Sequence, residues 1–428
     1  ARIPELRVIS RSSAFSFKGM KIDIPEIARR LNVAYVLEGS VRKAGDQVRI
    51  TAQLIEAGSD MHLWSHTYDR TLEDIFVIQD EIAATVVDEL KLTLLGESPV
   101  VVETNPDAYA LHLRARHLGN NVSEETMAQA VVLLREALEL DPNYAVAWNS
   151  LAHVFSIQAG RGLIPAEEGY VMAREALDRA LAIDPDFAAA HANLGWLTMS
   201  DDLTAAALHI KRALELEPAN PSGIRYAAIL LRNLGRVEEA IVLDEYAVAR
   251  DPVNPIGFSN LGFKYLYVGR WEDAIDAFST ALQLSPGYIG AHYYIGVAYL
   301  LSGQPEKALE AIQKERFEAF RQLGLTMTYH ALGRVTDSNR ELSNLIEAYE
   351  RDAAYNIAYV VAFRGEVDRA FEWLHKAFEY GDPGLSEIPG WPLFDNIQED
   401  PRWLPFLGSV GYAPEQLASI TFFVKPPQ

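Results

Sequence analysis

Residues 255–286 read PIGFSNLGFKYLYVGRWEDAIDAFSTALQLSP, and this stretch decides the fold of most of the chain. Four of its side chains recur at the i, i+3, i+4, i+7 spacing of an amphipathic helix: Phe258, Leu261, Gly262 and Tyr265. Gly269 is placed to end that helix, as a glycine beyond the C-cap does. Trp271 then opens a second helix, Ala274 begins its buried stripe, and Pro286 stops it. The stretch therefore predicts a helix–turn–helix unit.

The same unit repeats along the chain with a period close to 34 residues. Prolines that follow an acidic residue or serine are spaced by 43, 33, 34 and 34 residues: Pro142, Pro185, Pro218, Pro252 and Pro286. Two further series have a spacing of 34: Gly235, Gly269 and Gly303, and Ala240, Ala274 and Ala308. Three markers with one period predict stacked helical hairpins. We expect about eight units over residues 106–384, with the extra residues of the 43-residue unit in an enlarged turn at Gly160–Pro165.

The pattern of large, Leu-Gly, Tyr, Ala, Phe and Pro positions in residues 258–286 resembles the tetratricopeptide repeat. The resemblance implies an all-α superhelix in which the first helices of the units line a concave groove. Residues 385–428, rich in proline and aromatic residues, are expected to form a cap and tail, because a terminal repeat exposes an apolar face. A peptide-binding role for the tryptophans of this tail is the alternative.

The first 96 residues have a different pattern. Arg7–Ser10 predicts a short strand, and Asp23 begins a helix that ends near Leu31. Three further strands are expected at residues 35–41, 47–55 and 62–68, and a long amphipathic helix at 75–95. This order predicts a small mixed-sheet α/β domain.

The segments RSSAFSFKG (11–19), VLEGSVR (36–42) and ITAQL (50–54) resemble the TolB-N-terminal-like (FlgO-like) domain of bacteria. That domain often precedes tetratricopeptide arrays, C-terminal to adenylate/guanylate cyclase or CadC-like winged-helix modules. The family's domain opens with a further strand and helix, so we expect this chain to carry an incomplete copy. The resemblance thus implies an output domain that lies outside these 428 residues.

Composition excludes several classes of protein. The formal charge of −21 disfavours nucleic-acid binding. Residues 1–96 hold 12 basic and 14 acidic residues, and the remainder holds 26 and 45. An acidic array suits basic partners, but a solvated outer face is the favoured explanation of the charge. The chain has no cysteine and no apolar run of 18 residues, which leaves cytoplasm or periplasm open, the cytoplasm being favoured.

No catalytic, metal or cofactor motif accompanies the repeats. His62 and His66 are four residues apart on a predicted strand, about 13 Å, which is too far for one metal ion. Arg11 and its neighbouring serines have donors suited to an anion, but loop serines more often bond to backbone groups. We therefore expect neither catalytic residues nor a cofactor.

The expected groove is mixed aromatic and basic. Its candidate peptide-binding residues are Asn149, His153, Trp196, Arg225, Ile229, Arg232, Asn233, Phe263, Tyr267 and Tyr293. Aromatic side chains anchor a bound segment, and arginine pairs with a carboxylate. The sequence thus favours a non-catalytic scaffold or sensory module that binds a polypeptide. The alternatives are a structural or homo-oligomerising module whose groove is filled by its own tail, and an α/β domain that binds a small molecule.

Overall fold

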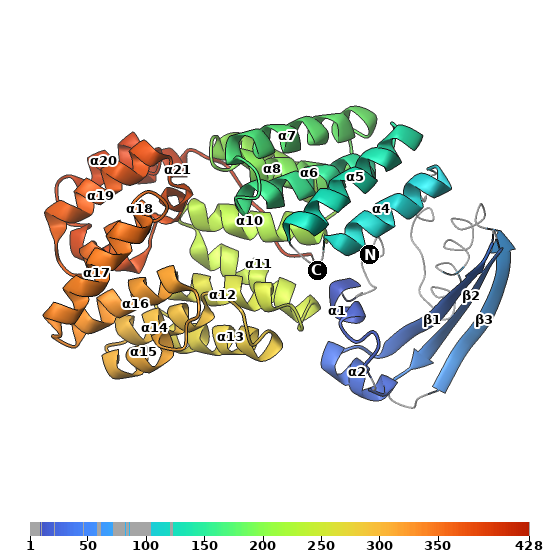
Figure 1. The fold of residues 1–428 in the computed structure, drawn as a ribbon, viewed down its shortest axis with the longest axis horizontal. Coiled ribbons are helices and arrows are strands. Elements are labelled where there is room, and N and C mark those ends of the chain that lie inside the picture. The colour runs from blue at the N-terminus through green and yellow to red at the C-terminus, as the bar shows by residue number, and fades with distance from the viewer. Residues whose placement is uncertain are drawn as a thin grey trace.

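The computed structural model describes residues 9, 11–20, 22–45, 47–57, 61–71, 82, 85, 104–119 and 123–427. It has two parts: an N-terminal three-stranded sheet with two short helices, and a long array of paired helices that coils back on itself (Figure 1). The expected fold class, a small α/β unit followed by a tetratricopeptide-like superhelix, is confirmed.

The N-terminal part is an antiparallel meander in the order β1-β2-β3. Its elements are α1 (Arg11–Phe15), α2 (Ile24–Leu31), β1 (Tyr35–Ala44), β2 (Gln47–Glu56) and β3 (Met61–Thr71). The Asp23 side chain accepts the Glu26 N–H at 2.9 Å and caps α2, as the sequence predicts. On β2, burial alternates through Val48, Ile50, Ala52 and Leu54, which is the expected half-buried pattern.

Two N-terminal predictions lie outside the described residues. The strand at Arg7–Ser10 is described only at Ile9, so a mixed sheet stays a prediction. The helix at 75–95 is described only at Ile82 and Thr85, and Ile82 packs against the sheet. The three described strands are all antiparallel.

Eight helical hairpins follow between residues 106 and 380 of the described chain. They are α4 (Pro106–Leu118) with α5 (Glu124–Leu140), α6 (Ala145–Gly160) with α7 (Ala166–Ile183), α8 (Ala188–Thr198) with α9 (Leu203–Leu216), α10 (Pro221–Asn233) with α11 (Val237–Arg250), α12 (Pro255–Tyr267) with α13 (Trp271–Leu284), α14 (Ala291–Leu301) with α15 (Pro305–Ile312), α16 (Glu318–Ala331) with α17 (Val335–Tyr349), and α18 (Ala354–Phe363) with α19 (Val367–Tyr380).

The long second unit corrects one expectation. Its nine extra residues do not sit mainly in the turn. Compared with the 34-residue unit of α12 and α13, α6 is three residues longer, α7 four residues longer and the turn at 161–165 two residues longer. Both helices extend because their added residues continue the apolar and charged helical patterns without a breaker before Gly160.

Small residues set the distance between the two helices of a hairpin. A Cβ added at Gly296 of α14 would lie 2.3 Å from Cγ1 of Ile312 in α15, so no larger residue fits this crossing. The turn glycines have the left-handed backbone that the sequence predicts, with φ of +73° at Gly269 and +74° at Gly303. Close crossings and tight turns together hold each unit compact.

The chain after α19 packs back onto the array. It forms η2 (Pro383–Glu387), η3 (Pro392–Ile397), α20 (Trp403–Ser409) and α21 (Pro414–Ala418). Trp391, Phe394 and Trp403 are buried in the same core as the late units. Phe422 is buried instead with residues of α10 and α11, and the C-terminus lies near the middle of the array (Figure 1). This segment covers the last hairpin and also reaches an earlier unit.

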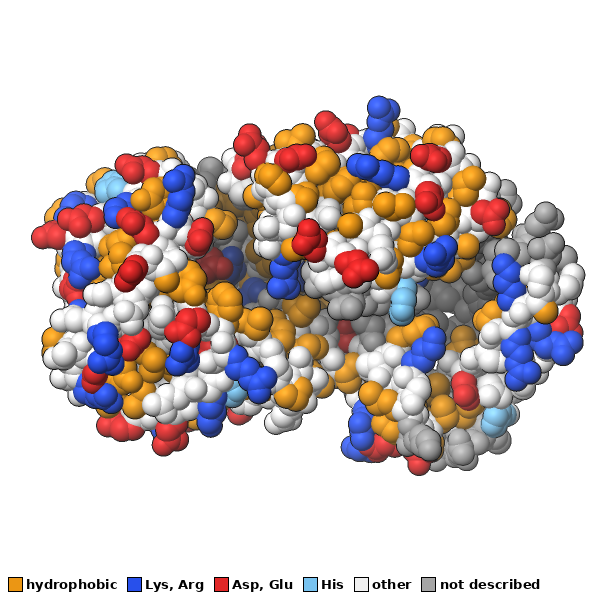
Figure 2. Space-filling model, in the orientation of Figure 1, with side chains coloured by type: hydrophobic (Ala, Val, Ile, Leu, Met, Phe, Trp, Pro, Cys, Tyr) orange, Lys and Arg blue, Asp and Glu red, His pale blue; other side chains and the backbone are white. Residues whose placement is uncertain are grey.

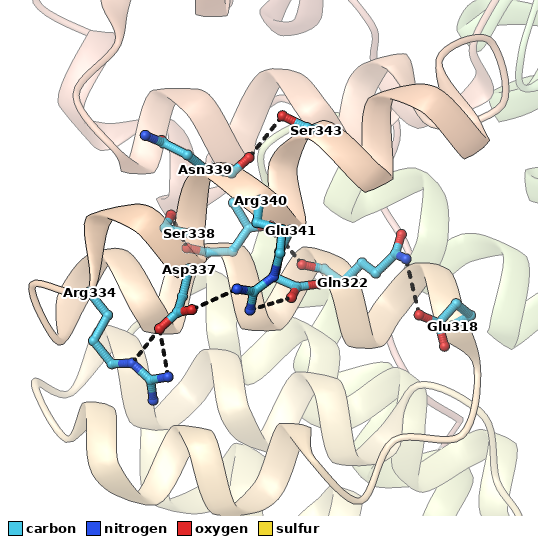
Figure 3. A network of polar contacts seen from close by, with 10 residues as sticks. Glu318, Gln322, Arg334, Asp337, Ser338, Asn339, Arg340, Glu341 and Ser343 are labelled. Atoms are coloured by element: carbon cyan, nitrogen blue, oxygen red, sulfur yellow. Dashed lines mark hydrogen bonds and ion pairs between the residues drawn. The ribbon is translucent and has the colours of Figure 1, made fainter.

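The outer face of the array carries charges that pair locally. On α17, Asp337 bridges Arg334 and Arg340 at 2.6 and 2.9 Å, and Arg340 also reaches Glu341 at 3.3 Å (Figure 3). Exposed pairs of this kind stabilise by only ~0.2–1 kcal/mol each. Here the outer charges form a solvated surface. Among the described helices, none has the length and apolar character needed to cross a bilayer.

Gly296→Ala tests the close crossing. The added methyl group collides with Ile312, and the overpacking is expected to lower the free energy of unfolding by ~1–3 kcal/mol. Gly287→Ala is the control, because a Cβ there meets no atom within 4 Å. Thermal unfolding followed by circular dichroism compares the two variants. Equal midpoints for both would contradict the packing described here.

Candidate peptide-binding groove

Four first helices, α6, α8, α10 and α12, place side chains around an open pocket of about 270 Å³. Its lining includes four of the predicted groove residues: His153, Trp196, Arg225 and Ile229. The rest of the lining was not selected by the sequence analysis, and it includes Asn193, Ile256 and Asn260. We call this site the open pocket. Asn193 and Asn260 occupy the same position of the repeat, two residues before the glycines at 195 and 262. This shared position is the sequence pattern by which both could have been predicted as pocket residues.

An aromatic and cationic stack forms one wall of the open pocket. Trp196 stacks on Tyr226, with ring centroids 5.3 Å apart and an interplanar angle of 16°. The Arg225 guanidinium lies 4.6 Å from the centroid of the same tyrosine and donates a hydrogen bond to its hydroxyl at 2.8 Å. Trp196 keeps 41% of its surface exposed, although it is a large apolar residue. The wall therefore presents an indole face and a cation to the solvent.

Amide side chains continue from this wall along the array. The Asn193 amide donates to the Asn149 carbonyl oxygen at 2.8 Å, and the Tyr226 hydroxyl donates to the Asn193 oxygen at 3.4 Å. This links α6, α8 and α10 through polar groups on their concave side. Asn149, also predicted for the groove, does not line the pocket itself. It accepts the hydrogen bond that positions Asn193, which does line the pocket.

His153 is solvent-exposed within the open pocket, yet its surroundings disfavour its charged form. Partial desolvation by the surrounding helices, and secondarily the Arg225 charge, lower the pKa of His153 below its ordinary value of 6.5. The neutral form of the imidazole is therefore favoured at this position. Arg225 then supplies the positive charge of this wall, which suits a carboxylate.

The other half of the predicted groove is covered by the chain itself. We call residues 383–397 the strap; η2 of the strap contacts both α10 and α18. Glu387 pairs with Arg232 at 3.3 Å, and the Tyr267 hydroxyl donates to the Glu387 carbonyl oxygen at 2.8 Å. Trp391 stacks on Phe263 with centroids 5.1 Å apart. Asn233 is buried and accepts two hydrogen bonds from the Arg232 guanidinium. Figure 2 shows the surface hollowed between the early and late halves of the array, with charged side chains inside the hollow.

Tyr293 does not reach any open surface, contrary to its prediction as a groove residue. It is fully buried, stacks on Phe320, and shares a hydrogen bond of 2.9 Å with the Tyr359 hydroxyl. Phe320 belongs to α16 and Tyr359 to α18, so side chains of two later first helices enclose the Tyr293 ring. The position that faces the groove in an early unit is therefore core in this one.

A buried ion pair that the sequence analysis missed lies behind the covered half. Lys264 of α12 and Asp244 of α11 are 2.6 Å apart, with only 3% and 5% of their side chains exposed. Burial lowers the pKa of Lys264 and raises that of Asp244, so each charge depends on the other. The signal in the sequence was a lysine inside the apolar run LGFKYL.

The N-terminal sheet brings together no metal site. Trp64, His66 and Tyr68 share one face of β3, with Trp64 and His66 centroids 6.4 Å apart. Within the described residues no group of three or more histidine, aspartate or glutamate side chains is arranged to hold a metal ion. The side chains of Arg11 and Ser12, considered for anion binding, lie outside the description.

The comparisons with known proteins agree with this architecture. The family model described as "TPR repeat" matches residues 264–303, from the end of α12 through α14. The chain therefore contains a tetratricopeptide repeat. Over 156 residues it is 40% identical to "Putative adenylate cyclase 3" of Rhizobium meliloti (strain 1021), which is 36% of this chain and 27% of that protein. Over 228 residues it is 23% identical to "Transcriptional regulator HilA" of Salmonella typhimurium, covering 51% and 40%. The chain thus spans between about a quarter and two fifths of these relatives.

Several solved structures align with large parts of this chain at low identity. A human IFIT1 dimer with m7Gppp-AAAA has a TM-score of 0.49 at 15% identity, covering 71% of this chain and 77% of that one. PilF of Pseudomonas aeruginosa has a TM-score of 0.39 at 20% identity, covering 48% and 92%. YrrB, described as a TPR protein with an unusual peptide-binding site, has a TM-score of 0.33 at 19% identity, covering 48% and 96%. At these values the likeness concerns the fold alone.

Lys264→Met tests the dependence of the buried pair. The substitution leaves Asp244 buried without its cation, and the free energy of unfolding is expected to fall by ~3–5 kcal/mol. The double variant Lys264→Met/Asp244→Leu removes both charges and should recover most of that loss. Denaturant unfolding followed by tryptophan fluorescence measures both variants. A double variant as unstable as the single one would contradict this interpretation.

The titration of His153 is a second test. Its midpoint is expected below 6.5, and Arg225→Gln should raise it part of the way back, because desolvation, the larger cause, remains. NMR of the chain labelled with ¹³C-histidine measures the midpoint, and His153→Gln assigns the signal. An unchanged midpoint in Arg225→Gln would show that the two side chains are not electrostatically linked.

Proposed function

We propose that this chain is a non-catalytic interaction module that binds a partner polypeptide in the open pocket and regulates an output domain. The observation that carries the proposal is the exposed Trp196 face beside the Arg225 cation, on the concave side of the repeat array. The match to the tetratricopeptide repeat supports the same class of function.

The chemistry of the open pocket favours one kind of segment. Trp196 and Ile256 are both exposed apolar side chains, and burying such surface is the main source of binding free energy. Arg225 adds a partner for a carboxylate, and the amides of Asn193 and Asn260 suit a peptide backbone. A pocket of about 270 Å³ holds one or two side chains, so we expect a short anchor motif with an apolar and an acidic residue.

The regulatory part of the proposal draws on the relatives. One is named as an adenylate cyclase and the other as a transcriptional regulator, and this chain spans less than half of each. We therefore propose an output domain of one of these two kinds in the parent protein. We further propose that residues 1–96 are a TolB-N-terminal-like domain, 106–384 the repeat array and 385–428 a cap and tail, in a cytoplasmic protein.

A structural module with a self-filled groove is the second candidate. It is favoured by the strap, which occupies the α10–α12 half of the groove through Glu387 and Trp391. It does not account for the open pocket, where Trp196 remains exposed. Homo-oligomerisation and small-molecule binding by the α/β part stay as further alternatives.

Trp196→Ala and Arg225→Glu test binding in the open pocket. Peptides are first selected from a random library displayed on phage and panned against the full chain. Each substitution is expected to weaken the selected peptides by about tenfold or more, because it removes either an apolar anchor or the pairing cation. Fluorescence anisotropy with labelled peptides measures the dissociation constants.

Leu208→Ala is the matched control. Leu208 belongs to a second helix, α9, and is 67% exposed, so its truncation removes apolar surface away from the open pocket. It should leave the affinity unchanged. Peptides that bind all four proteins equally, or that fail only with Leu208→Ala, would place the binding surface elsewhere.

A further inference from the structure

The strap sits on the array in the way a bound peptide would. It crosses the concave side between α10 and α18. It is far from α10 in sequence, because Arg232 and Glu387 are 155 residues apart. Its contacts with α10 and α12 include one acid on a cation, one backbone carbonyl on a tyrosine hydroxyl, and one indole among aromatic rings. Its η3 part packs on α18 through Phe394. These are the elements of peptide recognition by a groove.

The indole of Trp391 packs among three aromatic rings from two helices, α12 and α18. Its ring centroid lies 5.1 Å from that of Phe263, 5.0 Å from that of Tyr267 and 6.3 Å from that of Tyr359. Arg232 lies 5.3 Å from the Phe263 centroid and is only 8% exposed. If the strap moved away, a nearly buried cation and several aromatic faces would lose their partners. An incoming carboxylate and aromatic side chain would replace those partners directly.

The seat of the strap and the open pocket belong to one continuous surface. Both use α10, which presents Arg225 and Ile229 to the open pocket and Arg232 to the strap, at the i, i+4, i+7 spacing of one helix face. Both also use α12, through Asn260 and Phe263. A polypeptide that starts in the open pocket and continues along α10 therefore meets the strap.

The strap's fit is incomplete in a way that favours exchange. The Trp391 indole N–H and the Tyr355 hydroxyl are buried and have no hydrogen-bond partner among the described residues. An unsatisfied buried polar group destabilises the state that buries it. These two unpaired groups lower the stability of the seated strap, while its buried Ile388, Leu393, Phe394 and Ile397 hold it on the array.

We propose that the strap is an intramolecular ligand that competes with the partner polypeptide for the α10–α12 half of the groove, and that the partner carries a carboxylate four residues before an aromatic side chain, as Glu387 and Trp391 are placed. This inference rests on the proposed function of the open pocket. It adds the sequence motif of the partner and the regulation of partner binding by the strap. Binding then requires the strap to open, so the measured affinity is the intrinsic affinity reduced by the fraction of open molecules.

The test weakens the strap in the full chain and measures binding of a probe in trans. The probe is a fluorescein-labelled synthetic peptide with the strap sequence PGLSEIPGWPLFDNI. Glu387→Gln removes the charge that pairs with Arg232, and Trp391→Phe independently reduces the aromatic contact of the strap with Phe263 and Tyr267. Both changes lie in the strap and leave the surface that binds the probe unchanged. Each variant is expected to bind the probe about tenfold more tightly than the wild-type chain, since the open fraction rises.

Two controls make the result specific. Glu399→Gln removes the same charge from an exposed residue of the C-terminal segment, and it should bind like wild type. A probe in which the glutamate and tryptophan are replaced by glutamine and alanine should lose the affinity gained in Glu387→Gln. Circular dichroism of both strap variants should match wild type, which separates strap opening from unfolding.

Three results would overturn the inference. The first is equal affinity of Glu387→Gln, Trp391→Phe and Glu399→Gln for the probe. The second is equal binding of the altered probe. The third is dimers of Glu387→Gln in light scattering, which would make a second copy the occupant. Failure here is distinct from failure of the proposed function. If only this inference fails, binding of the peptides selected against the chain still depends on Trp196. If the proposed function fails, their binding does not depend on Trp196.

Discussion

The close packing of two helices at small residues is the constraint on which the rest of the structure depends. At Gly296 the facing Ile312 lies where a Cβ would be, and at Gly195 the facing Ile210 does the same, 2.6 Å from an added Cβ. Each hairpin then presents an apolar face that only its neighbours can cover, so the units must stack. Stacking aligns the first helices along one side, and this alignment brings residues as far apart in sequence as Ala152 and Asn260 into one pocket. The groove is a consequence of the crossing distance within each unit.

The groove has two halves, one that is open and one that is covered by the strap. α6 and α8, with the first halves of α10 and α12, line the open pocket, and Trp196 and Arg225 form part of its wall. The second halves of α10 and α12 are covered by the strap, and in α14 the corresponding position is the core residue Tyr293. The two halves share α10 and α12. Although the formal charge of the chain is −21, the groove contains two arginines. Arg225 lines the open pocket, and Arg232 is paired with Glu387 of the strap.

Periodicity predicted the helices because each unit depends mainly on local spacing. Gly269, Gly303 and the alanines at 34-residue intervals occupy the turns and crossings that the structure shows. The strap could not be predicted, because the pairing of Arg232 with Glu387 spans 155 residues and follows no repeat. Tyr293 was misplaced for a related reason: its position in the repeat is that of Asn149, and only the packing of α16 and α18 distinguishes the two. Glu315 is a further case. It is buried and accepts backbone N–H groups from Gly290, Arg316 and Phe317, a role with no sequence pattern.

Hydrogen–deuterium exchange of the full chain, with and without a selected peptide, tests the central claim most directly. If a polypeptide binds the concave side, α6, α8, α10 and α12 gain protection while the strap, residues 383–397, loses it. Protection confined to β1–β3, or to the second helices on the outer face, would contradict the account.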